Sequence, residues 1–217
     1  MVTSLMDNDV LHKTTAYGLF ADMLAIPRLQ KEVYGALGTA KFVVRKKLSK
    51  RPPSRGVDAA LTEFTAALGM LKEIEPTPEE VETAANIERL AQLQNLELDT
   101  GESILCAVLL ARHLGHILTG DKRAIKALEV LNAAEPYLNN FKSKIICLEQ
   151  LFYWLANNHE IQKVRNAVCA DKTVDSALAS CFGCYSPEVQ NETCIEGLNS
   201  YIQDLRQDAP NVLASED

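Results

Sequence analysis

Apolar residues in this chain fall into two patterns, short runs that predict strands and spaced positions that predict one-sided helices. Residues 2–6 are apolar at alternate positions and stop at an acidic turn, which is typical of a first strand. Residues 16–24 place apolar side chains on one face and predict a helix, with Thr14 or Thr15 as its cap and Pro27 at its end. The chain therefore opens as strand, turn and helix.

The region after this opening has a mainly helical pattern. The segment 28–50 is ambiguous, because Phe42, Val43 and Val44 fit either a strand or part of a helix, and it runs into a basic, proline-rich loop. Apolar positions within residues 60–71 predict an amphipathic helix. Another helix is predicted over residues 77–95, because Thr77 can cap its start and Glu80 completes a capping box.

A second strand, turn and helix follows in the middle of the chain. Residues 104–114 are apolar on nearly all sides and predict a buried helix, with Gly115 as its C-terminal cap. Residues 116–119 form a brief apolar run that predicts a strand, and residues 121–131 have the spacing of an amphipathic helix. Repetition of this unit predicts a parallel sheet covered by helices.

The C-terminal third is helical in pattern after Pro136, and the polar tail from Gln207 onward is expected to be frayed. We therefore predict an α/β fold with three layers, α/β/α, around a short parallel sheet in residues 1–150. Residues 151–217 are predicted to form a mostly helical extension that packs on this domain or follows it.

Composition places the chain among ordinary globular proteins, with 217 residues, 47% hydrophobic and 24% charged. The net charge of −7 argues against coating of nucleic acid by bulk attraction but leaves room for a local basic site. No segment reaches the roughly 20 apolar residues of a membrane helix. Because Asp7 and Asp9 interrupt the start of the chain, a secretory peptide is not expected either, and we predict a cytoplasmic protein without a membrane partner.

Three acidic residues stand where a parallel sheet would bring them together. Asp7 and Asp121 each follow a predicted strand directly, and Glu102 lies in the first turn of a predicted helix. Each also has a structural explanation, as a helix cap or a turn residue. Three converging carboxylates repel one another unless a cation neutralises them, and ligands that are all oxygen favour Mg²⁺ or Mn²⁺.

The segments that carry these acids resemble the PIN-domain ribonucleases. Residues 5–11, LMDNDVL, look like the opening of that family, a strand that ends in Asp followed by a polar pair and Val-Leu. Residues 101–111, GESILCAVLLA, and 117–124, ILTGDKRA, are similar to its later acidic motifs in order and spacing. The resemblance covers roughly residues 1–150, so the predicted fold is PIN-like.

This resemblance implies metal-dependent cleavage of RNA, with Mg²⁺ or Mn²⁺ held by Asp7, Glu102 and Asp121 as catalytic ligands. Many members carry another acid near the end of the second strand, but residues 42–48 are basic there. A fourth carboxylate would come from Asp9 or Glu149, or is missing. RNA is the implied partner. An inhibitory partner protein, as in toxin and antitoxin pairs, and self-association are left open.

A local concentration of positive charge lies between residues 41 and 55 of this acidic chain. It consists of Lys41, Arg45, Lys46, Lys47, Lys50, Arg51 and Arg55. One interpretation is a solvated helix end and loop. The other is an RNA-binding arm, formed by Arg45, Lys46, Lys47, Lys50 and Arg51, that contacts phosphates beside the metal site.

Two other functions fit parts of the same sequence. Asp7-x-Asp9 after an apolar strand also resembles the opening of the haloacid-dehalogenase-like phosphatases, in which the first Asp is the nucleophile and the second the general acid. Asp121 could then be the late acidic motif, but Glu102 would have no role. A PIN-like module without catalytic activity, which binds a partner protein, is the other alternative.

The six cysteines are too few for a disulfide scaffold and are expected to be reduced thiols. Four of them, Cys169, Cys181, Cys184 and Cys194, lie within 26 residues. A single CxxC with irregular outer spacing is a weak zinc signal, so zinc is not expected at these positions.

Overall fold

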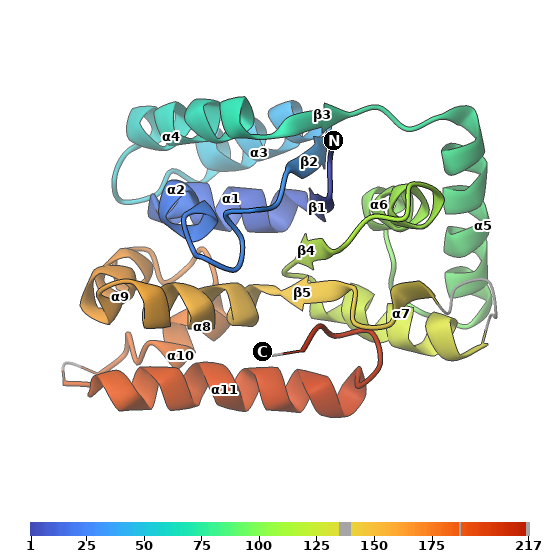
Figure 1. The fold of residues 1–217 in the computed structure, drawn as a ribbon. Helices are drawn as coiled ribbons and strands as arrows, with labels where there is room; N and C mark the ends of the chain where they lie inside the picture. The colour runs from blue at the N-terminus through green and yellow to red at the C-terminus, as the bar shows by residue number, and fades with distance from the viewer. Residues whose placement is uncertain (135–139, 187, 216–217) are drawn as a thin grey trace.

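The computed structural model describes residues 1–134, 140–186 and 188–215, and it shows a parallel sheet between two layers of helices (Figure 1). The strands are β1 (Ser4–Met6), β2 (Tyr34–Leu37), β3 (Lys72–Ile74), β4 (Ile117–Thr119) and β5 (Ile145–Cys147). The helices are α1 (Asn8–Tyr17), α2 (Phe20–Leu24), α3 (Ala40–Lys50), α4 (Val57–Met70), α5 (Pro78–Leu93), α6 (Thr100–Ala111), α7 (Lys122–Ala134), α8 (Leu148–Asn158), α9 (Ile161–Ala170), α10 (Ser176–Cys181) and α11 (Asn191–Asp208). The predicted three-layer α/β/α class is confirmed. Pro136 lies outside the described residues.

The order of the strands, β3-β2-β1-β4-β5, reverses at the centre of the sheet. The chain moves outward from β1 to β3, then crosses to the other side of β1 for β4 and β5, and every pair is parallel. The two central strands are in register at Leu5 with Ile117 and at Met6 with Leu118. In open parallel sheets, a ligand crevice forms beyond the carboxyl ends of the strands where the order reverses. Here that point lies between β1 and β4.

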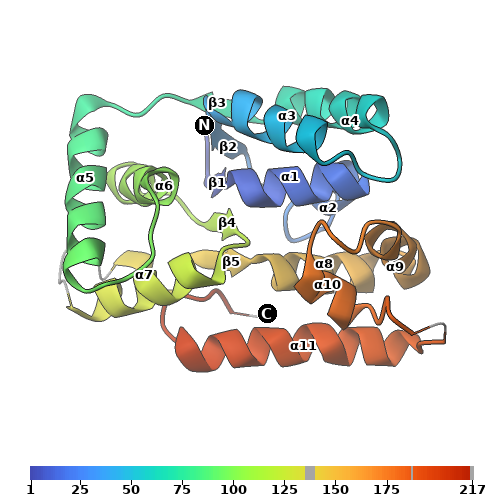
Figure 2. The same ribbon diagram turned by 180° about the vertical axis from the view of Figure 1, so that it is seen from behind.

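Successive side chains of a strand point to opposite faces, so the two central strands each contribute to two cores. Leu5 and Ile117 pack into the core beneath α5, α6 and α7, whereas Met6 and Leu118 pack into the core on the opposite face. That face is covered by α1 to α4 and by α8 to α10 (Figure 2). Long helix α11 borders both cores, because Leu198 belongs to one and its later residues to the other. No helix in the described part of the chain is long and apolar enough to cross a membrane.

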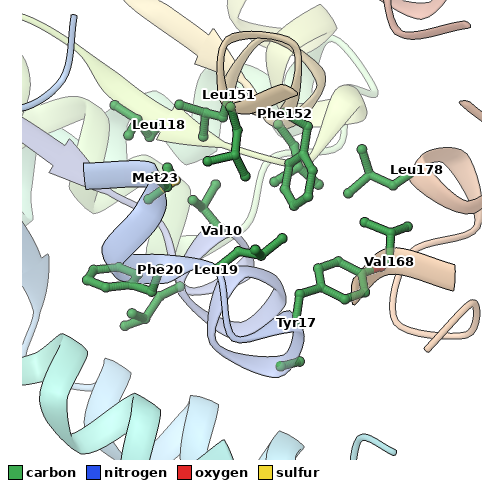
Figure 3. Packing of buried hydrophobic residues seen from close by; sticks show 14 of the residues in the cluster. Val10, Tyr17, Leu19, Phe20, Met23, Leu118, Leu151, Phe152, Val168 and Leu178 are labelled. Carbon is green, nitrogen blue, oxygen red and sulfur yellow. The ribbon is translucent and has the colours of Figure 1, made fainter. Parts of the chain in front are cut away.

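The C-terminal helices share a core with the N-terminal ones. The ring of Tyr17, at the end of α1, meets the ring of Phe152 on α8 edge to face at 5.9 Å. Side chains around Tyr17 also pack with Val168 of α9 and Leu178 of α10 (Figure 3). The predicted domain boundary at residue 150 falls inside α8. The extension is therefore packed on the α/β layers over a continuous apolar core.

The described tail residues 209–215 pack against β5, so the prediction of frayed residues from Gln207 onward is wrong for the part of the tail that the structure describes. Ala209, Val212 and Leu213 are almost wholly buried. The backbone N–H of Ile145 donates to the carbonyl of Val212 at 2.9 Å, and Leu213 forms a parallel bridge with Ile145. The sequence does not predict this packing, because the few apolar residues of the tail show neither helical nor strand periodicity. They are held instead by the outer edge of β5, whose backbone groups would have no partner without the tail.

The first helix begins earlier than its apolar spacing predicts. Asp7 caps α1, and Thr14 and Thr15 lie inside the helix instead of capping it. Their hydroxyls donate to the carbonyls of Val10 and Leu11, both at 2.7 Å, so these buried polar groups are satisfied within the helix. The segment predicted as one helix is two, α1 and α2.

Of the other local predictions, one is confirmed and others differ from the structure. The capping box of Thr77 and Glu80 is confirmed at the start of α5. Gly115 does not cap α6, which ends at Ala111 and turns through a positive φ of 51° at His113. In the ambiguous segment 28–50, Phe42, Val43 and Val44 belong to helix α3, and the strand is β2 at Tyr34–Leu37 instead.

Candidate functional site

A cavity of about 670 Å³ opens at the reversal point of the sheet, beyond the ends of β1 and β4. Seven carboxylates line it: Asp7, Asp9, Asp99, Glu102, Asp121, Glu149 and Asp175. The four bases in its wall are Lys13, Lys47, Lys122 and Arg123. The three carboxylates predicted as metal ligands are thus brought to one cavity, together with both candidates for a fourth.

Asp7 connects the end of β1 with the start of α1. Its carboxylate accepts backbone N–H groups of Asn8 at 2.6 Å and Asp9 at 3.4 Å, and the Thr119 hydroxyl of β4 donates to it at 3.3 Å. Burial, and then the neighbouring charge of Asp9, raise the pKa of Asp7 from 3.8 to about 6, although the two N–H groups lower it. Burial is therefore the main reason that the Asp7 carboxyl holds its proton more tightly than a free carboxyl group does.

Glu102 lies in the first turn of α6, in a capping box with Asp99. The Glu102 N–H donates to the Asp99 carboxylate at 2.8 Å, and the Asp99 N–H donates back to Glu102 at 2.9 Å. Burial raises the pKa of Glu102 from 4.5 to about 8, and the charges of Asp99, Asp121 and Asp7 add to this rise. The three predicted ligands are therefore close enough for their charges to interact.

Asp121 differs from the other two because an arginine neutralises it. Its carboxylate accepts the backbone N–H groups of Arg123 at 2.8 Å and Ala124 at 3.3 Å, which caps α7, and it also lies 3.1 Å from the Arg123 guanidinium. Burial alone would raise the pKa of Asp121, but the bonds from Arg123 and Ala124 outweigh it, and the pKa lies below its ordinary value.

Cap and ligand roles are compatible for these carboxylates. Within residues 1–134, 140–186 and 188–215, no group of three His, Cys, Asp or Glu side chains is arranged to hold a metal ion. The carboxylates are turned toward helix N–H groups and Arg123. A carboxylate has about four acceptor positions, and a cap uses one or two of them. Oxygen donors of this kind are the type that Mg²⁺ and Mn²⁺ prefer, but in the described residues they are not arranged around one ion position.

Both candidates for a fourth carboxylate are ion-paired with lysines. Asp9 accepts a salt bridge from Lys13 at 2.5 Å, and Lys47 lies 4.0 Å away. Glu149 is buried at the start of α8 and pairs with Lys122 at 2.7 Å. Each lysine offers its carboxylate an alternative to a metal ion.

The prediction from sequence missed part of the cavity wall. Lys13 bridges Asp9 on α1 and Asp175, which caps α10, at 2.5 and 2.7 Å. The spacing of Asp9 and Lys13, four residues apart on one helix, is a signal that could have been found. Asp175 carries no such signal, because its approach depends on how the C-terminal helices pack.

The basic segment comprises the end of α3 and the loop that follows it, a location that both of its interpretations allow. Of α3, only Ala40, Val44 and Leu48 are buried. Lys47 reaches the cavity wall, whereas Arg45, Lys46, Lys50 and Arg51 are exposed outside it. The structure thus places one of the five predicted RNA-binding residues at the cavity.

The expectation of reduced cysteines is wrong for one pair. Cys169, at the end of α9, forms a disulfide with Cys184, which follows α10, and the Cα atoms are 5.0 Å apart. The packing of α9 against α10 brings together two residues 15 positions apart, a proximity that the CxxC pattern does not predict. Cys181 and Cys194 are buried free thiols, as are Cys106 and Cys147.

Comparisons with known proteins leave the resemblance to PIN-domain ribonucleases as a prediction. No protein-family model matches the chain, and searches of curated proteins and of solved structures found no match either.

Proposed function

We propose that this chain is a metal-dependent ribonuclease whose reaction centre is the carboxylate cavity between β1 and β4. One observation carries the proposal: Asp7, Glu102 and Asp121 line one cavity at the reversal point of the sheet, and the pKa of Glu102 is raised by burial and by charges that include the other two. Parallel topology alone brings the starts of α1 and α7 to this edge, but α6 does not directly follow a strand, so topology does not account for the presence of Glu102.

In this proposal Asp7, Glu102 and Asp121 hold a divalent cation. Bound there, Mg²⁺ or Mn²⁺ supplies an activated water and stabilises charge on the phosphate. The chain's own residues do the rest. The Thr119 hydroxyl orients Asp7, and Asp99 fixes the first turn of α6 that carries Glu102.

The bases in the cavity wall give a phosphodiester a place to bind. Acids outnumber bases by three among the charged residues that line the cavity. A polyanion entering this field needs cationic partners. Lys47 is half exposed and 4.0 Å from Asp9, so its ammonium can turn toward a phosphate, whereas Lys13 is held between two carboxylates.

The test combines unfolding and cleavage. Wild type, Asp7→Asn and Asp121→Asn are melted in chelator and in millimolar Mn²⁺ and then incubated with a mixed RNA pool. We expect Mn²⁺ to stabilise wild type by mass action, and we expect both the stabilisation and RNA cleavage to be lost in the variants. Glu82→Gln is the matched control, because Glu82 is an exposed acid on α5 outside the cavity.

Two results would contradict the proposal. Wild type without any shift in melting temperature and without cleavage would favour the inactive binding module. Release of phosphate from a small phosphomonoester, without RNA cleavage and with dependence on Asp7 and Asp9, would favour the phosphatase. The fold is compatible with that alternative, although Asp9 is paired with Lys13.

A further inference from the structure

Helix α3 exposes a large aromatic side chain that the fold does not use. The Phe42 side chain is 68% exposed and that of its neighbour Val43 is 38% exposed. The helix packs through Ala40, Val44 and Leu48 alone. Neither exposed residue contributes to the core, so packing does not account for them.

Basic residues precede and follow this aromatic residue on α3. Lys41 Nζ lies 5.5 Å from the centroid of the Phe42 ring and is held there by Glu73 at 2.9 Å. One helical turn further on, Arg45 and Lys46 are exposed and form no ion pair with another described residue. An exposed ring among cations is the combination that binds unpaired nucleic acid, because each base offers a flat face and each linkage a phosphate.

The same helix borders the carboxylate cavity. Val43, which follows Phe42 directly, and Lys47, one helical turn after Val43, both line the cavity. A single-stranded RNA that lies along α3 would therefore lead into the cavity where cleavage is proposed.

We propose that α3 is a binding surface for unpaired RNA, on which Phe42 stacks a base while Lys46 and Arg45 contact phosphates. The direction of the strand into the cavity rests on the proposed nuclease function, but the binding itself does not. A duplex presents its bases stacked and paired, so it cannot use the Phe42 ring. A membrane surface fits less well, since one Phe and one Val are a small apolar face for an interfacial helix.

The test measures binding of a labelled single-stranded RNA in chelator, which separates binding from cleavage. Phe42→Leu keeps an apolar side chain but removes the ring, whereas Phe42→Trp keeps a ring. We expect Phe42→Leu to weaken binding about tenfold with an unchanged salt slope, and Phe42→Trp to bind at least as well as wild type. Tyr185→Leu is the matched control, because Tyr185 is also exposed, at 69%, with Lys172 over its ring.

Each other outcome overturns the proposal. It fails if Phe42→Leu binds single strands like wild type, if duplex RNA of equal length binds as tightly, or if anionic vesicles are the only ligand lost in Phe42→Leu. The nuclease proposal fails separately, when wild type binds RNA in chelator but cleaves none in Mn²⁺. Conversely, cleavage by Phe42→Leu with unchanged kcat and KM would contradict RNA binding by α3 and leave the nuclease proposal standing.

Discussion

The carboxylate cavity and the surface of α3 adjoin each other, yet the fold constrains them very differently. In the cavity, Asp7 and Asp121 cap helices and Glu102 completes the capping box of Asp99, and all three also line the cavity. On α3, the exposed ring of Phe42 and the charge of Lys46 contribute nothing to packing. Substitutions in the cavity should therefore change stability and function together, whereas those of Phe42 and Lys46 should change binding alone.

The largest effect should be a pH dependence of the free energy of unfolding that comes from the carboxylates of the cavity and not from the surface of α3. The folded-state pKa values of Asp7 and Glu102, about 6 and about 8, lie above their ordinary values of 3.8 and 4.5. The folded protein therefore holds these protons more tightly than the unfolded chain. Their contribution to the free energy of unfolding is fully present below pH 3.8 and 4.5 respectively, and is lost as pH rises toward 8.

Glu102→Gln removes one of these titrations while keeping a side-chain oxygen for the Asp99 N–H. We expect metal-free wild type and Glu102→Gln to be nearly equally stable at pH 4.5, and Glu102→Gln to be the more stable by pH 8.5. Chemical denaturation across this range measures the difference, with Glu82→Gln as control. If the free energies of unfolding of wild type and Glu102→Gln differ by the same amount at every pH, the pKa of Glu102 is not raised by folding.

A smaller effect should come from the lysine that joins α1 to the C-terminal helices. Lys13→Met leaves Asp9 and Asp175 without their shared cation, and its side chain is only 13% exposed. We expect a loss of about 2 kcal/mol in the free energy of unfolding. Lys41→Met breaks a salt bridge on α3 whose lysine is 44% exposed, and should cost less than about 0.5 kcal/mol. Equal losses would break the contrast between cavity and surface.

Loss of a cap alone should have a still more limited effect. Asp99→Ala removes the side chain that accepts the Glu102 N–H, and should lower the free energy of unfolding by about 1 kcal/mol with or without Mn²⁺. Denaturation under both conditions tests this. A loss that appears only in Mn²⁺ would make Asp99 a further ligand.

The smallest change in stability should follow from neutralising the basic arm. Replacing Lys46, Lys47, Lys50 and Arg51 with Gln should change the free energy of unfolding by less than about 0.5 kcal/mol. RNA binding should weaken, and the slope of its salt dependence should become shallower. Titrations at several salt concentrations test this, and an unchanged slope would exclude phosphate contacts by the arm.

Sequence patterns predict the positions of the acidic residues in the cavity better than they predict the strands around it. Asp7 and Asp121 could be placed because an apolar run ends at each of them, and parallel strands align such ends. Strands β2, β3 and β5 were not predicted. Residues 72–74 form an edge strand with two exposed residues, and the apolar run at 145–147 continues directly into α8. Three residues are too few for either period to show.

The remainder of the cavity depends on long-range packing. Asp175 reaches Lys13 from 162 positions away because α8, α9 and α10 pack on α1, and no local pattern encodes that arrangement. The pairing of Cys169 with Cys184 has the same origin. Capping boxes, by contrast, are local, and that of Thr77 could be predicted in full.

The buried tail also has a consequence for how the protein avoids sticking to itself. Strand β5 is the last in the sheet, and the tail covers its open side through Ile145 with Val212 and Ala214. An uncovered edge strand is a template for pairing with another chain. A protein shortened at Asp208 should therefore aggregate through β5, even though every residue of the cavity would still be present.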